Sequence, residues 1–349
     1  MASSKEEQAL PRRVAVVGAG AWGTALARHL AFKGLEVDFW VREPEVLEEI
    51  ITVRENRTFL PGVFLPEGIR PSHDFQTVVA EQKVVMLVVP SPFVRGVLKG
   101  LSGFLSPGVI LCSGAKGIEN DTLLTMSQVM TDVLPPELAF HKTCLSGPSF
   151  AREVGQGLPT AVTVAAGNVR VSRLLQTLFA SPLLRVYSSQ DLIGVELGGS
   201  LKNIYAVSAG ICDGLGLGTN ARAALITRGL AEMSRLGVRM GANPLTFMGL
   251  AGVGDLILTC TGDLSRNRTV GLKLGRGQKL ADILAEMKQV AEGIKTTKSV
   301  YDLARREGVD MPVCEQVYYV LHEGKDPKRS LVDFMTRDLK AEIDQVLMV

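Results

Sequence analysis

The chain has 349 residues, of which 46% are hydrophobic and 21% are charged, and its formal net charge is +2. This composition is typical of a folded globular protein and excludes a largely disordered chain, and the length is comfortable for two domains. A charge balance so close to neutral gives no support to binding of nucleic acid or a membrane surface through overall basic charge.

The cysteines and the apolar stretches indicate the cellular compartment of the protein. The five cysteines are scattered without a CxxC pair, which favours free thiols in a reducing compartment over a disulfide framework. No apolar stretch reaches the roughly 18 to 20 residues that span a bilayer. Residues 1–12 are polar, lack the hydrophobic core of a secretion signal, and are expected to form a disordered tail. We therefore expect a cytoplasmic protein with no integral membrane segment and no nucleic-acid partner.

The first predicted strand, 14–17, runs directly into the sequence GAGAWGTALA, which starts at Gly18. In a dinucleotide-binding turn of this pattern, Gly18 permits the tight turn, Gly20 lets the backbone approach a pyrophosphate, and Gly23 lets the helix lie close to the strand. The phosphates bind at the helix N-terminus, where free N–H groups and the helix dipole favour anions. A β-α turn without a ligand can share the three glycines, but the strand before them and a second predicted strand, 36–41, favour nucleotide binding.

Short apolar runs continue through the first half of the chain and predict the remaining strands of one sheet. They are separated by segments of helical periodicity and lie at 84–89, 109–112, 143–145 and 161–165. Near-continuous apolar strands alternating with helices indicate a mostly parallel, doubly wound sheet that is covered on both faces. We predict an α/β Rossmann domain over residues 13–190, with its ligand at the edge where the turns after the strands gather.

After residue 190 the strand-like runs nearly vanish and 3.6-residue periodicity takes over. The pattern predicts a second, all-α domain over residues 191–349. The predicted helices lie at 194–210, 220–237, 280–285, 300–307 and 315–322.

Two lysines stand in unusual surroundings. Lys116 lies in SGAKGIE, just after a predicted strand, where a lysine flanked by small residues is well placed for a bound anion. The alternative for Lys116 is an ordinary lysine in a surface loop. Lys202 lies in GVELGGSLKNIYA on a predicted helix, and desolvation there would lower its pKa and suit it for proton transfer. The alternative for Lys202 is a core helix lysine whose charge reaches water.

A buried acid and a pair of donors follow. Asp255 lies in the apolar, glycine-rich run 250–258, where a carboxylate is costly to bury without a partner such as a lysine. Arg266 and Asn267 offer forked and amide donors that suit a phosphate or a carboxylate. A solvated turn is the alternative for Arg266.

These stretches together resemble the bacterial type of NAD(P)-dependent glycerol-3-phosphate dehydrogenase. The matching segments run in family order from residue 14 to about 335 and include GAGAWGTALA from Gly18, LSGPSFAREV from Leu145, GVELGGSLKNIYA from Gly194 and SRNRTVG from Ser265. The resemblance implies a Rossmann domain followed by a helical substrate domain, usually in a homodimer. It also implies reversible reduction of dihydroxyacetone phosphate to sn-glycerol 3-phosphate by NADPH or NADH without a metal, supplying glycerophospholipid synthesis.

The resemblance also implies the site residues. Its substrate-binding residues are Lys116, Gly147, Ser149, Lys202, Asn203, Asp255, Ser265, Arg266 and Asn267. Its cofactor-binding residues are Gly18, Gly20, Ala21, Trp22, Gly23, Arg42, Phe93, Lys116, Ala151, Arg266, Val290 and Glu292.

In the reaction so implied, three of these residues are catalytic. Lys202 donates a proton to the developing alkoxide, Lys116 polarises the carbonyl, and Asp255 orients Lys202. Two neighbouring lysines lower each other's pKa, and the sequence does not decide which of them moves the proton.

Two questions stay open at this stage. The second strand ends at Trp40-Val41-Arg42-Glu43, and Arg42 favours the 2′-phosphate of NADP(H), whereas NAD sites usually place an acid first. A β-hydroxyacid or 6-phosphogluconate dehydrogenase shares the domain order and a helical Lys-Asn pair, although the segments around Asp255 and Arg266 favour a triose phosphate. A non-catalytic nucleotide sensor would leave Lys116, Lys202 and Asp255 without a role.

Overall fold

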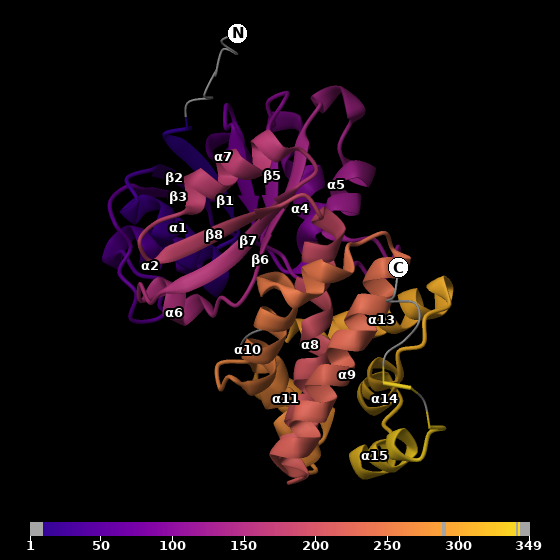
Figure 1. Cartoon of the computed structure of the whole chain (residues 1–349). Helices are drawn as coiled ribbons and strands as arrows, with labels where there is room; N and C mark the ends of the chain where they lie inside the picture. The colour runs from indigo at the N-terminus through magenta and orange to yellow at the C-terminus, as the bar shows by residue number, and fades with distance from the viewer. Residues whose placement is uncertain (1–9, 288–290, 340, 343–349) are drawn as a thin grey trace.

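The chain folds into two parts in the computed structural model (Figure 1). The structure describes residues 10–287, 291–339 and 341–342. The first part is an eight-stranded sheet with helices, and the second is an assembly of helices below it in Figure 1. The predicted boundary after residue 190 falls between the last strand, which ends at Ser189, and the long helix that begins at Leu192. Most of the predicted tail, 1–12, lies outside the described residues.

The sheet is mostly parallel, as predicted. Within the described residues its strand order is β3-β2-β1-β4-β5-β6-β7-β8, and only the β6–β7 pair is antiparallel. The strands are β1 (Arg13–Val17), β2 (Glu36–Trp40), β3 (Ile69–Ser72), β4 (Val84–Leu87), β5 (Ile110–Ser113), β6 (His141–Ser146), β7 (Thr160–Ala166) and β8 (Leu184–Ser189). The sequence did not predict β3 and β8, which are the two edge strands.

Helices cover both faces of the sheet, because alternate residues of each central strand enter different apolar clusters. In β1, Val14 and Val16 belong to one buried cluster, and Ala15 and Val17 belong to another. The helices of this part are α1 (Ala21–Phe32), α2 (Pro44–Val53), α3 (Phe75–Val79), α4 (Val94–Leu101), α5 (Met126–Val133), α6 (Ala151–Gly155) and α7 (Val169–Phe179).

The second part is built around one buried helix, α8 (Leu192–Gly214). Its other helices are α9 (Gly218–Arg239), α10 (Asp255–Thr261), α11 (Arg266–Gly275), α12 (Leu280–Glu286), α13 (Glu292–Glu307), α14 (Pro312–His322) and α15 (Pro327–Met335). A Cβ atom on Gly210 of α8 would overlap the carbonyl oxygen of Arg268, and one on Gly271 of α11 would overlap that of Val207. Glycines therefore bring α8 and α11 into backbone contact, which places the start of α11 beside the middle of α8.

The pattern predicted α8, α9, α12 and α14 closely but only the second half of α13, and it did not predict α10, α11 or α15. No helix among the described residues is long and apolar enough to cross a membrane.

Candidate active site

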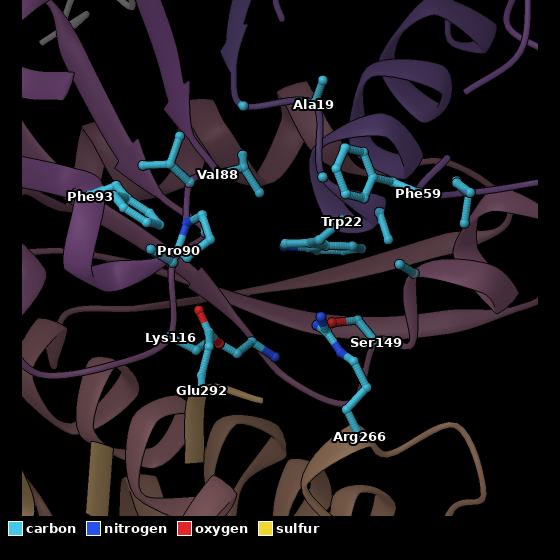
Figure 2. Close-up of a pocket in the computed structure, with 18 of the residues that line it drawn as sticks. Ala19, Trp22, Phe59, Val88, Pro90, Phe93, Lys116, Ser149, Arg266 and Glu292 are labelled. Carbon is cyan, nitrogen blue, oxygen red and sulfur yellow. The ribbon is translucent and has the colours of Figure 1, made fainter. Parts of the chain in front are cut away.

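A cleft of about 920 Å³ lies between the carboxyl edge of the sheet and the helical part (Figure 2). Turns that follow β1, β4, β5 and β6 line one side of it. The helical part contributes residues of α8, α10 and α11 and the first residue of α13 to the other side. The strand ends of a doubly wound sheet bind ligands at this place, as the sequence led us to expect.

The turn after β1 has the geometry that its glycines predict. Gly18 has φ +117°, and a Cβ on it would lie 2.7 Å from the carbonyl oxygen of Val88. A Cβ on Gly23 would overlap the carbonyl oxygen of Gly18, so α1 has to start this close to the strand. A Cβ on Gly20 would meet no atom within 4 Å, and Gly20 lines the cleft. Backbone at the start of α1 is thus open to an anion.

Asn56 supports this turn through its side chain, although the sequence analysis assigned it no role. Its Nδ2 donates to the carbonyl oxygen of Ala19 and to Oγ1 of Thr24, each at 2.8 Å, and the residue is fully buried. The contact joins positions 37 and 32 residues apart in the chain, which no local pattern reveals.

Aromatic side chains line the dinucleotide end of the cleft. Trp22 lies in the cleft facing Phe59, and its buried indole Nε1 has no hydrogen-bond partner in the described part of the protein (Figure 2). A buried indole N–H normally has a partner, so an unpaired one in the lining of a cleft is unusual. Phe93 is 45% exposed at the opposite wall. Phe59, Leu60 and Pro61 come from a segment to which the sequence analysis assigned no site residue.

Arg42 lies at the outer end of the cleft, just beyond β2. Its guanidinium pairs with Glu43 at 2.7 Å and lies 5.6 Å from the centroid of the Phe93 ring. Glu43 precedes α2 directly, and its side chain is turned toward Arg42 rather than away from it. The residues therefore offer a cation and an aromatic face next to each other, both of which suit an adenosine phosphate.

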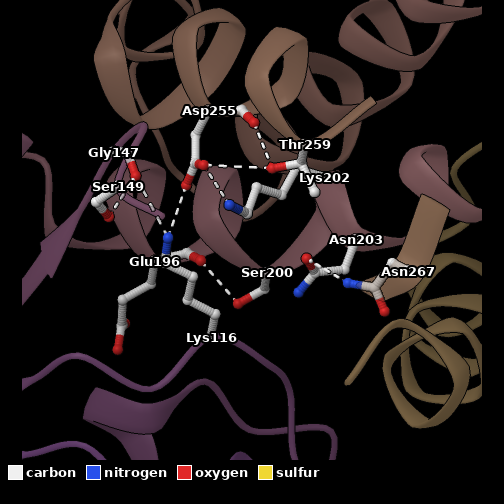
Figure 3. A network of polar contacts seen from close by, with 10 residues as sticks. All are labelled: Lys116, Gly147, Ser149, Glu196, Ser200, Lys202, Asn203, Asp255, Thr259 and Asn267. Atoms are coloured by element: carbon white, nitrogen blue, oxygen red, sulfur yellow. Dashed lines mark hydrogen bonds and ion pairs between the residues drawn. The ribbon is translucent and has the colours of Figure 1, made fainter. Parts of the chain in front are cut away.

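Lys116, Lys202 and Asp255 form one cluster at the inner end of the cleft (Figure 3). Asp255 is fully buried and pairs with Lys202 through Oδ1 and with Lys116 through Oδ2, the latter at 2.9 Å. The two lysine side chains are 7% and 15% exposed, so neither is a surface lysine. The expectation that Asp255 has a lysine partner is confirmed, and it has two.

Burial changes the protonation of Lys202. Its pKa is lowered to about 7, chiefly by desolvation, and the positive charge of Lys116 contributes to the lowering. The carboxylate of Asp255 opposes both and keeps the ammonium form accessible near neutral pH. Thr259 lies one turn after Asp255 on α10 and lines the cleft. Its hydroxyl donates to the Asp255 backbone carbonyl. The i to i+4 spacing is the signal that could have selected Thr259.

The neighbours of Lys202 on α8 are held by protein contacts. A Cβ on Gly198 would overlap the carbonyl oxygen of Ala251, and one on Gly199 would overlap the Ser146 hydroxyl. The close approach expected at these glycines is therefore made by the protein itself.

A chain of amides connects α8, α11 and α13. Asn267 donates to Oδ1 of Asn203 at 2.9 Å, and its own Oδ1 accepts the backbone N–H of Gly293 at 2.9 Å. Asn203 and Asn267 both line the cleft. The Asn267 oxygen is occupied, so only its second N–H is available to a ligand.

Arg266 and Ser265 lie at the start of α11. The Ser265 hydroxyl accepts the backbone N–H of Arg268 and caps the helix. Arg266 is exposed, and its guanidinium extends into the cleft beside Ser149 (Figure 2). It does not lie in a solvated turn, because it begins a helix that borders the cleft.

The remaining predicted residues lie at several places around the cleft. Gly147 is not among the cleft-lining residues but accepts a hydrogen bond from Lys116 at 3.3 Å, while Ala21 and Ala151 line the cleft. Glu292 lies on the wall opposite Arg266, and burial raises its pKa while Arg266 and the two lysines oppose the rise. Val290 lies outside the described residues. Within the described ranges, no group of three or more His, Cys, Asp or Glu residues is arranged to hold a metal ion.

Known protein families match both parts of the chain. A model described as the N-terminus of NAD-dependent glycerol-3-phosphate dehydrogenase matches residues 13–172, and one described as its C-terminus matches residues 191–332. The chain belongs to the NAD-dependent glycerol-3-phosphate dehydrogenase family. It is an oxidoreductase, and a Rossmann fold for a nicotinamide cofactor agrees with the open turn after β1.

Individual relatives agree with this assignment. A glycerol-3-phosphate dehydrogenase [NAD(P)+] from Geobacter sulfurreducens is 57% identical over 333 residues, which cover 95% of this chain and 99% of the relative. One from Syntrophobacter fumaroxidans is 54% identical and covers 95% and 97%. The crystal structure of glycerol-3-phosphate dehydrogenase from Coxiella burnetii superposes with a TM-score of 0.89 at 39% identity and covers 94% of this chain and 99% of that one.

Proposed function

We propose that the protein reduces dihydroxyacetone phosphate to sn-glycerol 3-phosphate, reversibly, with Lys202 as the proton donor. The observation that carries the proposal is the buried Lys202–Asp255–Lys116 cluster at the inner end of a dinucleotide cleft. A bound reduced nicotinamide supplies the hydride to the ketone carbon. The protein's own residues then have to deliver a proton and stabilise negative charge at the former carbonyl oxygen.

The pKa of Lys202 suits this task. A proton donor is most effective when its pKa lies near the working pH, and that of Lys202 is lowered to about 7. Its Nζ gives the proton to the alkoxide oxygen, and the same Nζ accepts it in the reverse reaction. Lys116 adds positive charge next to the oxygen, and Asp255 holds both ammonium groups in place through one carboxylate.

The start of α11 supports binding of the phosphate group. Arg266 extends into the cleft from the first position of this ten-residue helix, whose N-terminal end carries the positive end of the helix dipole. Asn267 adds one amide N–H. Binding energy from the phosphate would position the ketone at Lys202.

We assign a preference for NADPH to Arg42. Its guanidinium, stacked over Phe93 at the outer end of the cleft, matches a 2′-phosphate better than a free ribose hydroxyl. Glu43 holds this guanidinium at 2.7 Å and would compete with the phosphate for it. NADH is therefore accepted as well.

The biological setting of the reaction follows from the family resemblance. We place the protein in the cytoplasm, because all five of its cysteines are free and buried. We propose that it acts as a homodimer and that its product supplies glycerophospholipid synthesis.

The absorbance of the reduced nicotinamide tests the proposal directly. Purified protein is mixed with dihydroxyacetone phosphate and NADPH, and in parallel with NADH. Absorbance falls with both and faster with NADPH. Folded protein that binds the nucleotide but shows no loss with either one would contradict the proposed substrate, and β-hydroxyacids would then be assayed in the oxidising direction with NADP+ and NAD+.

A further inference from the structure

Lys116 is carried by a loop of the sheet domain that is held by the helical domain. The loop spans residues 114–125, between the end of β5 and the start of α5. Its two limbs pair through an antiparallel bridge between Ile118 and Thr125, and the Glu119 backbone N–H donates to the Leu124 carbonyl at 3.0 Å. Because of this bridge, a force on Thr125 is transmitted to a residue two positions after Lys116.

Glu196 of α8 is hydrogen-bonded to the Thr125 end of the loop. The residue is 7% exposed, and its carboxylate accepts three hydrogen bonds: from the Thr125 hydroxyl at 2.9 Å, the Ser127 backbone N–H at 2.7 Å and the Ser127 hydroxyl at 2.6 Å. Burial raises the pKa of Glu196, and the bonds from Ser127 and Thr125 oppose this rise. A buried carboxylate with three donors at the start of α5 is a directional contact between the two domains.

The opposite limb of the loop is held as well. Ile118 is 2% exposed and belongs to the apolar cluster of the helical domain, although it lies in the sheet domain's half of the chain. Its carbonyl oxygen accepts the hydroxyl of Ser299 on α13 at 3.0 Å, and the same hydroxyl contacts Asn120. The helical domain therefore holds both limbs of the loop, and α8 supplies one of these contacts.

We propose that Glu196 is a positioning residue, which holds the 114–125 loop so that Lys116 stays within reach of Asp255 and Lys202. Lys202 follows Glu196 by six residues on α8, about 9 Å along the helix axis (Figure 3). One rigid helix thus carries the proton donor and also fixes the loop that brings the second lysine. This inference rests on the proposed role of Lys202.

The protonation of Lys202 reports on the position of Lys116. The charged and titratable groups facing Lys202 are Asp255, Lys116, Glu292 and Cys260. Of these, Lys116 lowers the pKa of Lys202 and Asp255 raises it. Reduction needs protonated Lys202, so its rate falls as pH rises through that pKa. If Lys116 moves away, the pKa of Lys202 rises and the fall in rate moves to higher pH.

The test compares pH profiles of kcat/KM for dihydroxyacetone phosphate at saturating NADPH. In Glu196→Gln we expect the midpoint to move up by about 0.5 pH unit or more, and kcat/KM at neutral pH to fall about tenfold. The Kd for NADPH should stay within about twofold, because Glu196, Thr125 and Ser127 are not among the residues that line the cleft. Thr125→Val should reproduce both changes, and Thr125→Ser, which keeps the hydroxyl, should restore the wild-type profile.

Glu232→Gln is the matched control. Glu232 is a buried carboxylate of α9 that accepts the backbone N–H groups of Val313 and Cys314 at the start of α14, within the helical domain. It should lower Tm without moving the pH midpoint.

The possible results separate the two proposals. If Glu196→Gln and Thr125→Val lower Tm as Glu232→Gln does and leave the midpoint unchanged, the positioning role is wrong. If Glu196→Gln does not fold, the Thr125 pair decides by itself. A wild-type enzyme without a midpoint near neutral pH would instead contradict the role of Lys202.

Discussion

Replacing Asp255 by asparagine keeps the shape of the side chain and removes the charge that Lys202 and Lys116 share. Asp255 is fully buried and is bonded to both ammonium groups, so water cannot replace the lost charge. The two lysines then face each other across a neutral amide. Because burial and the charge of Lys116 both lower the pKa of Lys202, and Asp255 opposes them, the pKa of Lys202 must fall in this variant.

The size of the effect follows from the geometry. At an effective dielectric constant of about 20, two unit charges about 4 Å apart attract by about 4 kcal/mol. The asparagine oxygen still accepts a hydrogen bond and the two lysines can move apart, so we count only about a third of this attraction as lost, which lowers the pKa of Lys202 by about one unit. Starting from a pKa of about 7, the protonated fraction of Lys202 near pH 7.5 falls from roughly a quarter to roughly 3%. Displacement of the lysines adds about another tenfold, so we expect kcat to fall about a hundredfold.

The assay is the pH profile of kcat for dihydroxyacetone phosphate reduction with saturating NADPH, with Asp38→Asn as the control. Asp38 is a buried carboxylate of β2 held by Arg13 and Arg70, remote from the cluster, so its variant loses stability and keeps the profile. In Asp255→Asn the fall of kcat moves to lower pH. The reasoning is refuted if the midpoint stays in place and kcat falls less than about twofold in a folded Asp255→Asn protein.

Four further substitutions test the dinucleotide end of the cleft. Arg42→Asp should raise KM for NADPH at least about tenfold and leave KM for NADH within about twofold. Glu43→Gln should lower KM for NADPH, because it removes the acid that competes for Arg42. Equal effects of Arg42→Asp on both cofactors in steady-state kinetics would contradict the role of Arg42. Gly23→Ala places a Cβ on the Gly18 carbonyl oxygen and should cost about 1–3 kcal/mol in the free energy of unfolding, measured in urea. Gly20→Ala has free space and should leave stability unchanged but weaken NADPH binding, measured by titration calorimetry; the opposite order of the two glycines would contradict our assignment.

The sequence predicted the centre of the sheet and missed its edges for a physical reason. Strands buried on both faces are continuous apolar runs, and β1, β4 and β5 at the centre of the sheet have this signature. The edge strand β3 has the sequence IRPS with one fully buried residue, and β8 alternates buried and exposed positions before it ends in serines. In the helical part, α11 was missed because its polar and glycine residues contact α8 rather than forming an apolar stripe.

The site was predictable where the free-energy cost of burying one charged residue implied a partner of opposite charge. A buried aspartate needs a cation, and this argument alone connected Asp255 with a lysine; the structure supplies Lys202 and Lys116. Asn56 and Glu196 could not be found in this way, because their partners lie far away in the chain and an asparagine or a glutamate has many satisfied positions in a protein.

Lys202→Met tests the central claim most directly. Methionine is similar to lysine in length and flexibility, so the cleft keeps its shape, but it lacks the ammonium group that donates the proton. The measurement is the rate of nicotinamide oxidation with dihydroxyacetone phosphate, together with the Kd for NADPH. We predict a rate at least about a thousandfold below wild type with a Kd within about twofold. A variant that binds NADPH and turns over at the wild-type rate would show that the proton comes from elsewhere and would contradict this account.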